Sequence, residues 1–264
     1  MSVRLAGNNL LRRRVPMPAP ADRLHRSWLT AAPIAHRGLH DRAGGRPENT
    51  LAAFARCCEL GFAAELDLRL SRDGEVVVFH DRSLRRLTGR SGRVEDRTAA
   101  QLGALRIHGT EERVPLLCEV LELVDGRVPL LLELKPQALG PALERAVLRA
   151  LHGYRGEVAI QSFKRRTLYH LDRSETPHAV GHLWRRLTVR RSVVPPAFYG
   201  CDVRALPIGA VCRLRAAGAV VLAWTVRSPE EARAALDHVD NYIFEHFVPE
   251  AAAHPFSAPR AAAG

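Results

Sequence analysis

The sequence contains no apolar run that approaches the roughly 18–20 residues of a transmembrane helix. Its five cysteines show neither a C-x-x-C pair nor the density of a disulfide scaffold, so we expect them to be small core residues in a reducing compartment. Arg12, Arg13 and Arg14 lie near the N-terminus, but no apolar region with a cleavage site follows them, and we expect no secretory signal. These features predict a cytoplasmic protein.

Lysine is nearly absent, although the chain is strongly basic. Lys135 and Lys164 are the only lysines, and arginine supplies the other cations behind the formal net charge of +11. The arginines are spread along the chain, without a basic helix, interleaved aromatic residues or a known nucleic-acid motif. We therefore expect no nucleic-acid partner. A basic surface favours anionic small molecules and a weak association with anionic membranes. The composition predicts no oligomeric state.

Short apolar runs alternate with helical segments from residue 33 onward. The 264 residues, 47% of them hydrophobic, suit one closed barrel, which typically needs about 250 residues. We predict strands at 33–36, 63–70, 76–80, 128–135, 157–162, 179–184, 198–203, 219–226 and 241–245. We predict helices at 50–60, 116–125, 141–152, 164–173, 207–217 and 228–237. This alternation predicts parallel βαβ units that close into an α/β fold, a TIM-type (β/α)8 barrel.

The remaining segments interrupt or flank the barrel. Only residues 71–75, with the turn dipeptide Asp73-Gly74, separate the strands at 63–70 and 76–80, so these two strands form a hairpin. Residues 82–118 contain polar, turn-like stretches and form a short insertion after the hairpin. We accordingly divide the chain into an N-terminal arm at 1–30, a barrel at 31–250 and a flexible tail at 251–264.

Charged residues lie at the strand ends, where such barrels place their active sites. Glu65 and Asp67 share one face of a strand because side chains alternate, and Glu133 and Lys135 repeat this arrangement between leucines. A solvated face is the alternative interpretation, but buried carboxylates would need a cation. Oxygen ligands favour one divalent ion, Mg²⁺ or Ca²⁺, and the lack of a matched cysteine and histidine cluster argues against zinc.

Two strand-end histidines, His36 and His80, would flank this metal. A phosphodiester needs such a set, because one histidine can deprotonate the nucleophile while the other protonates the leaving alkoxide. Arg37 and Lys135 would neutralise the phosphate oxygens. Glu48 would either cap the helix that follows or join the metal site.

Taken in order, these motifs resemble the glycerophosphodiester phosphodiesterase family. The resemblance rests on His36-Arg37-Gly38, Pro47-Glu48-Asn49-Thr50, Glu65-x-Asp67, Asp73-Gly74, His80-Asp81 and Glu133-x-Lys135, with weaker matches at Gln161-Ser162-Phe163 and Trp224-Thr225-Val226. It runs from about residue 33 to 248. The resemblance implies hydrolysis of glycerophosphodiesters to an alcohol and glycerol 3-phosphate. It implies catalytic histidines at His36 and His80, metal ligands at Glu65, Asp67 and Glu133, phosphate contacts from Arg37 and Lys135, and a substrate-lining Trp224.

The last predicted strand departs from the family pattern. Residues 242–247 are Tyr-Ile-Phe-Glu-His-Phe, where the family usually shows a Gly-Ile-Ile-Thr-Asp-like ending. The departure leaves the catalytic set intact, so it bears on substrate choice more than on activity. A lysophospholipase D or sphingomyelinase D on a related barrel would use the same site. A non-catalytic barrel that binds phosphodiesters is the alternative of another class.

Overall fold

The computed structural model describes residues 28–138, 140–185, 194–206 and 209–250. Most of the predicted arm and all of the predicted tail lie outside these residues, so the division into arm, barrel and tail stays a prediction. Trp28 and Leu29, at the start of the described part, are buried against the barrel interior. Across the described ranges, none of the helices combines the length and the apolar character needed to cross a membrane.

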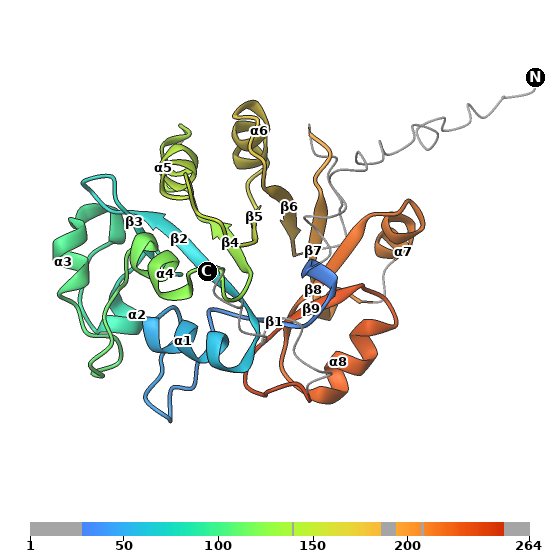
Figure 1. Cartoon of the computed structure of the whole chain (residues 1–264), viewed down its shortest axis with the longest axis horizontal. Coiled ribbons are helices and arrows are strands. Elements are labelled where there is room, and N and C mark those ends of the chain that lie inside the picture. The colour runs from blue at the N-terminus through green and yellow to red at the C-terminus, as the bar shows by residue number, and fades with distance from the viewer. Residues whose placement is uncertain (1–27, 139, 186–193, 207–208, 251–264) are drawn as a thin grey trace, which may run out of the picture.

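Eight parallel strands form a closed barrel, which confirms the predicted fold. The order around the ring is β1-β9-β8-β7-β6-β5-β4-β2, and β1 pairs with β2 to close it. The strands are β1 (Ile34–Ala35), β2 (Ala63–Leu70), β4 (Leu130–Leu134), β5 (Val158–Ser162), β6 (Ala179–Trp184), β7 (Phe198–Asp202), β8 (Val220–Val226) and β9 (Asn241–Phe244). Parallel neighbours need crossover connections, and the connecting helices lie outside the strands (Figure 1).

The longer helices of the described ranges each lie within a predicted segment. They are α1 (Leu51–Leu60), α4 (Leu117–Val124), α5 (Ala142–Ala150), α6 (Arg165–Arg173), α7 (Gly209–Ala216) and α8 (Pro229–Leu236). Helix α1 shows why the boundaries were predictable. The Thr50 side chain accepts a hydrogen bond from the Ala53 amide at the start of α1, and Gly61, with φ of 70°, ends it in the left-handed conformation.

The hairpin and the insertion lie beside the barrel. Strand β3 (Val76–Val78) pairs antiparallel with β2 and stands outside the ring. Between β3 and α4 lie α2 (Arg85–Thr88), the 3₁₀ helix η3 (Val94–Asp96) and α3 (Ala99–Gly103), at the left of Figure 1. We call residues 82–116 the excursion. It packs on β3 around a small core of its own, made of Val77, Phe79, Leu84, Leu87, Val94, Leu102, Ile107 and Val114.

The cysteines are only partly the core residues that composition predicts. All five are free, and Cys57 and Cys201 are buried. Cys118 and Cys212 are exposed instead, because they lie on the outer faces of α4 and α7.

An apolar layer fills the barrel floor with one residue from each strand: Ile34, Ala63, Leu131, Ala159, Ala179, Phe198, Leu222 and Ile243. Three of these are alanines, and the large Phe198 ring fills space that they leave. A Cβ atom added to the neighbouring Gly181 would lie 2.2 Å from that ring. Because strand side chains alternate, the residues two positions further along also point inward. This second layer includes His36, Glu65, Glu133, Trp224 and Glu245.

Replacing Phe198 by alanine should lower the free energy of unfolding by about 3–5 kcal/mol, because the floor loses a large fully buried ring and gains a cavity. Urea unfolding followed by circular dichroism would measure the change. Tyr169→Ala is the aromatic control, since Tyr169 is 43% exposed and surface changes usually stay within about 0.5 kcal/mol. Equal losses in the two variants would contradict the packing described here.

Candidate active site

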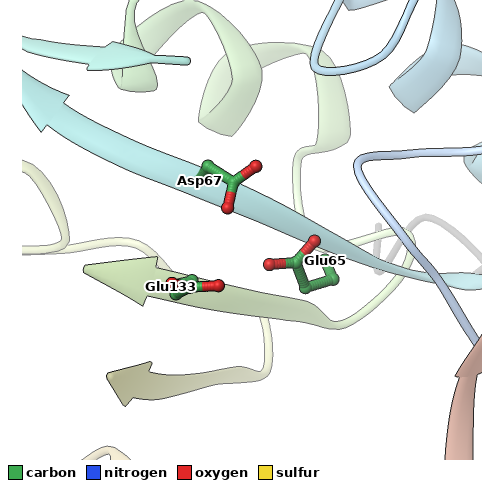
Figure 2. Close-up of side chains that lie close together, drawn as sticks. All are labelled: Glu65, Asp67 and Glu133. Atoms are coloured by element: carbon green, nitrogen blue, oxygen red, sulfur yellow. The ribbon is translucent and has the colours of Figure 1, made fainter. Parts of the chain in front are cut away.

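Three carboxylates meet at the barrel mouth. Glu65 and Asp67 come from β2 and Glu133 from β4, where Asp67 and Glu133 are direct partners in the register of the two strands. Each side chain offers an oxygen within 4.8 Å of the others, and Figure 2 shows them directed into the same space between the strands. All three residues are buried. The structure therefore brings together the predicted metal ligands.

Burial and mutual repulsion act strongly on these carboxyl groups. Burial raises the pKa of Glu65 well above its usual value, and the charges of Asp67 and Glu133 raise it further. Burial alone would also raise the pKa of Asp67, but the charges of Lys135 and Arg37 hold it far below its usual range. The cluster thus combines one stable carboxylate with neighbours whose charge is costly unless a further cation is present.

The two predicted phosphate-contacting residues border the cluster. Lys135 Nζ lies 2.5 Å from Glu133 Oε1 and 3.1 Å from Asp67 Oδ1. Arg37 Nε lies 3.2 Å from Asp67 Oδ2, while its Nη1 donates to Glu48 at 2.7 Å. Both cations therefore contact the carboxylate cluster directly. Glu48 neither caps α1 nor belongs to the three-carboxylate cluster.

Asn49 has a role that sequence reasoning did not separate from helix capping. Asn49 and Thr50, both of residue types that are common at N-caps, precede α1, and Thr50 is the cap. The buried Asn49 side chain instead donates to Asp67 Oδ2 at 2.8 Å and accepts from the Asp67 amide at 3.2 Å. Asn49 therefore fixes the orientation of the Asp67 carboxylate.

Each predicted catalytic histidine is oriented by a carboxylate. His36 Nδ1 donates to Glu245 at 2.5 Å, and His80 Nδ1 donates to Asp81 at 2.6 Å. A carboxylate accepts only, so Nδ1 carries the proton and Nε2 of each neutral ring keeps a lone pair. Burial lowers the pKa of His36 and lowers that of His80 to about 4.

Glu245 is a residue of the candidate site that sequence reasoning missed. It lies directly after β9, and alternation from Ile243 places it inside the barrel. Burial alone would raise the pKa of Glu245, but the hydrogen bond from His36 holds it far below its usual range. Arg227 Nε lies 2.8 Å from the other oxygen. The residues after β9 that depart from the family pattern thus supply the carboxylate that accepts the hydrogen bond of His36. The sequence does indicate its direction, because Glu245 lies two residues after Ile243 and strand side chains two positions apart share a face.

Arg86 joins the two sides of the site from the excursion. It donates to both oxygens of Glu48 at 2.7 Å and to Asp81 at 2.6 Å. Glu48 holds Arg37, and Asp81 holds His80, so one guanidinium connects the partners of a predicted phosphate-contacting residue and a predicted catalytic histidine. The position of Arg86 on α2 gave no sequence signal, because it is one of many arginines in a polar stretch.

Trp224 lies on the opposite side of the mouth from the carboxylates. It is in β8, which stands four strands from β4 in the ring order. Its ring meets Phe163 edge to face, with centroids 5.4 Å apart. Trp224 therefore lies apart from the carboxylates and their cations, but at the same barrel mouth.

The fold and these contacts define a (β/α)8 barrel with an acidic, histidine-flanked mouth. The model of the glycerophosphoryl diester phosphodiesterase family matches residues 36–244, and the chain belongs to this family.

Named relatives agree with this assignment. Over 165 residues the chain is 35% identical to a glycerophosphodiester phosphodiesterase of Caldanaerobacter subterraneus subsp. tengcongensis, which covers 58% of this chain and 66% of that protein. Over 102 residues it is 38% identical to a lysophospholipase D of Rattus norvegicus, covering 34% of this chain and 32% of that protein. The chain thus spans less than two thirds of either curated relative.

A solved structure is also similar. A phosphodiesterase of Oleispira antarctica, in complex with the product sn-glycerol-3-phosphate, superposes with a TM-score of 0.75 at 26% identity. The similarity covers 82% of this chain and 93% of that chain.

Replacing Glu245 by glutamine should lower the pKa of His36, because Glu245 raises that pKa against the effect of burial. The limb of the pH–rate profile that belongs to His36 should therefore move to lower pH. Turnover should fall by no more than the roughly 10²–10⁴ that a general acid or base contributes.

The measurement is the pH dependence of kcat/KM for phosphodiester hydrolysis. Glu230→Gln, which removes a carboxylate that is 73% exposed on α8, is the matched control and should leave the profile in place. A Glu245→Gln profile with both limbs unmoved would contradict the orienting role of Glu245.

Proposed function

We propose that this protein hydrolyses glycerophosphodiesters to an alcohol and glycerol 3-phosphate in a metal-dependent reaction. The observation that carries the proposal is the convergence of a buried carboxylate cluster with two carboxylate-bound histidines, His36 and His80. Family membership supports it, and so does the similarity to a phosphodiesterase solved with sn-glycerol-3-phosphate as its product.

Glu65, Asp67 and Glu133 would hold one divalent ion. Their ligand atoms are all oxygens, as Mg²⁺ and Ca²⁺ prefer. Asp67 Oδ1 is buried and accepts no hydrogen bond within the described residues, although Lys135 is near it. When bound, the ion would neutralise charge on the phosphate oxygens. The carboxylate repulsion described above supports a cation at this position, and either metal satisfies it.

Arg37 and Lys135 would bind and orient the phosphate. A guanidinium has five N–H donors and an ammonium has three. Both residues can therefore keep their ion pairs with the cluster and still donate to phosphate oxygens. Their positive charges would be most useful as negative charge grows on those oxygens in the transition state. Trp224 would line the substrate pocket on the other side.

His36 and His80 would move the protons. A hydroxyl of the substrate's own glycerol attacks phosphorus and gives its proton to Nε2 of one histidine. The P–O bond to the alcohol breaks, and the other histidine, which enters this step with a second proton on Nε2, donates that proton to the leaving oxygen. Water then opens the cyclic glycerol phosphate with the two histidine roles exchanged. The sum is one water added across one P–O bond, which leaves both histidines in their starting state.

A lysophospholipase D activity is the second candidate, because a rat protein of that name is 38% identical over 102 residues. It would need the same histidines and carboxylates and differ only in the acyl chain on the glycerol. A sphingomyelinase D activity would use the same site on a substrate without glycerol. Turnover of a water-soluble glycerophosphodiester by the purified protein supports the first candidate. Binding without turnover would instead indicate the non-catalytic alternative.

We propose a cytoplasmic location and a weak attraction to anionic membranes. Five free cysteines support a reducing compartment, and the net charge of +11 supports the attraction.

Removal of divalent ions by a chelator should abolish turnover, and Mg²⁺ or Ca²⁺ should restore it. Asp67→Asn should lose metal affinity, measured by calorimetry, while circular dichroism shows a retained fold, because relief of carboxylate repulsion offsets part of the lost coordination. Asp237→Asn, at an exposed position after α8, is the control with unchanged affinity. Full turnover in a verified metal-free sample would refute the metal requirement.

Loss of either histidine should reduce turnover by roughly 10²–10⁴, and the two losses should not add, since the pair acts as a unit. A p-nitrophenyl leaving group needs little protonation and should partly rescue only the variant that lacks the acid. Comparing His36→Ala and His80→Ala on this substrate and on a choline diester therefore assigns the roles. His152→Ala, at an exposed position, is the control. Near-normal turnover in both active-site variants would disprove the mechanism.

A further inference from the structure

An arginine covers an aromatic pair at the barrel mouth, formed by a residue that follows β5, the neighbour of β4, and a residue of β8 across the ring. Phe163 follows β5, and Trp224 belongs to the inward layer of β8. The Arg185 guanidinium carbon lies 5.0 Å from the centroid of Phe163 and 5.8 Å from that of Trp224. These are cation–π distances. Arg185 follows β6 directly, so it lies at the same end of the barrel as the site.

The guanidinium of Arg185 is not neutralised by a carboxylate of the described residues. Asp202 is close enough to sense its charge, because Arg204 and Arg185 both lower the pKa of Asp202, although burial alone would raise it. The Asp202 carboxylate is, however, bound at both oxygens by Arg204, at 2.9 and 2.5 Å. The positive charge of Arg185 at this part of the rim is therefore available to pair with an anionic group of a ligand.

The proposed reaction restricts which part of the substrate reaches this rim. The glycerol arm must stay at phosphorus, because its hydroxyl is the nucleophile. The alcohol arm is the variable part of the substrate, and it leaves phosphorus on the side opposite the attack. The alcohol arm is therefore the part that would extend from the carboxylates on β2 and β4 toward Arg185, which follows β6, two strands from β4.

We propose that Arg185, held on Phe163 and Trp224, binds the headgroup and favours glycerophosphodiesters whose alcohol carries a second anionic group, a phosphate or a carboxylate. This inference rests on the proposed function. A planar guanidinium suits such groups because it donates two parallel hydrogen bonds. A quaternary ammonium headgroup is disfavoured, since the ring faces that would attract it are already covered by a like charge.

The experiment compares kcat/KM for three diesters with the full-length protein. Bis(glycerophospho)glycerol carries a second phosphate, glycerophosphoglycerol has the matching neutral headgroup, and glycerophosphocholine has a cationic one. In Arg185→Gln the ratio of the first to the second should fall about tenfold, as expected for a charge-assisted contact at a partly exposed site. The ratio of the choline diester to the neutral one should rise. Arg185→Lys should lie between wild type and Arg185→Gln.

Arg233→Gln is the matched control, because it removes one positive charge from a side chain that is 71% exposed on α8; its ratios should equal those of the wild type. The wild-type preference should also weaken as ionic strength rises. Turnover with ratios that Arg185→Gln leaves unchanged would overturn this inference alone. No turnover of any of the three diesters by the wild type would overturn the proposed function as well.

Discussion

Mutual repulsion among Glu65, Asp67 and Glu133 is the constraint on which the mouth of this barrel depends. Three buried carboxylates at one place are unfavourable unless cations surround them. Lys135 and Arg37 supply part of that charge, and Asn49 fixes the orientation of Asp67. The carboxylates still need further positive charge beside them, and this makes the cluster suited to a divalent ion. The apolar floor below gives this layer a surrounding of low polarity, which makes each of these interactions stronger.

The closed ring is what brings distant parts of the chain into the site. Strands β1 and β9 are neighbours, so His36 and Glu245 meet although 209 residues separate them. The excursion makes a second long connection, because Arg86 reaches Glu48 in the loop after β1. The site is therefore assembled from the first and last strands of the barrel and from the segment that interrupts it. No single βαβ unit contains it.

Sequence pattern predicted the barrel and the placement of its charged residues because both follow from local rules. Alternation along β2 placed Glu65 and Asp67 on one face, and Thr50 and Gly61 marked the ends of α1. The partners of the histidines were less accessible. Asp81 adjoins His80 in sequence, but Glu245 and Arg86 act across long separations that depend on ring closure and on the path of the excursion. Such contacts follow from tertiary geometry, which one sequence without relatives does not contain.

The contact between Gly181 and Phe198 restricts how the barrel floor can diverge among related chains. A Cβ atom at position 181 would collide with the Phe198 ring, and the two residues are register partners on β6 and β7. A larger residue at 181 is therefore compatible only with a smaller one at 198. Substitutions at these two positions should appear together in evolution and rarely alone. Two residue combinations therefore suit the floor beneath the site: a small residue at 181 with a large one at 198, or the reverse. Changing only one of the two positions gives an unfavourable intermediate.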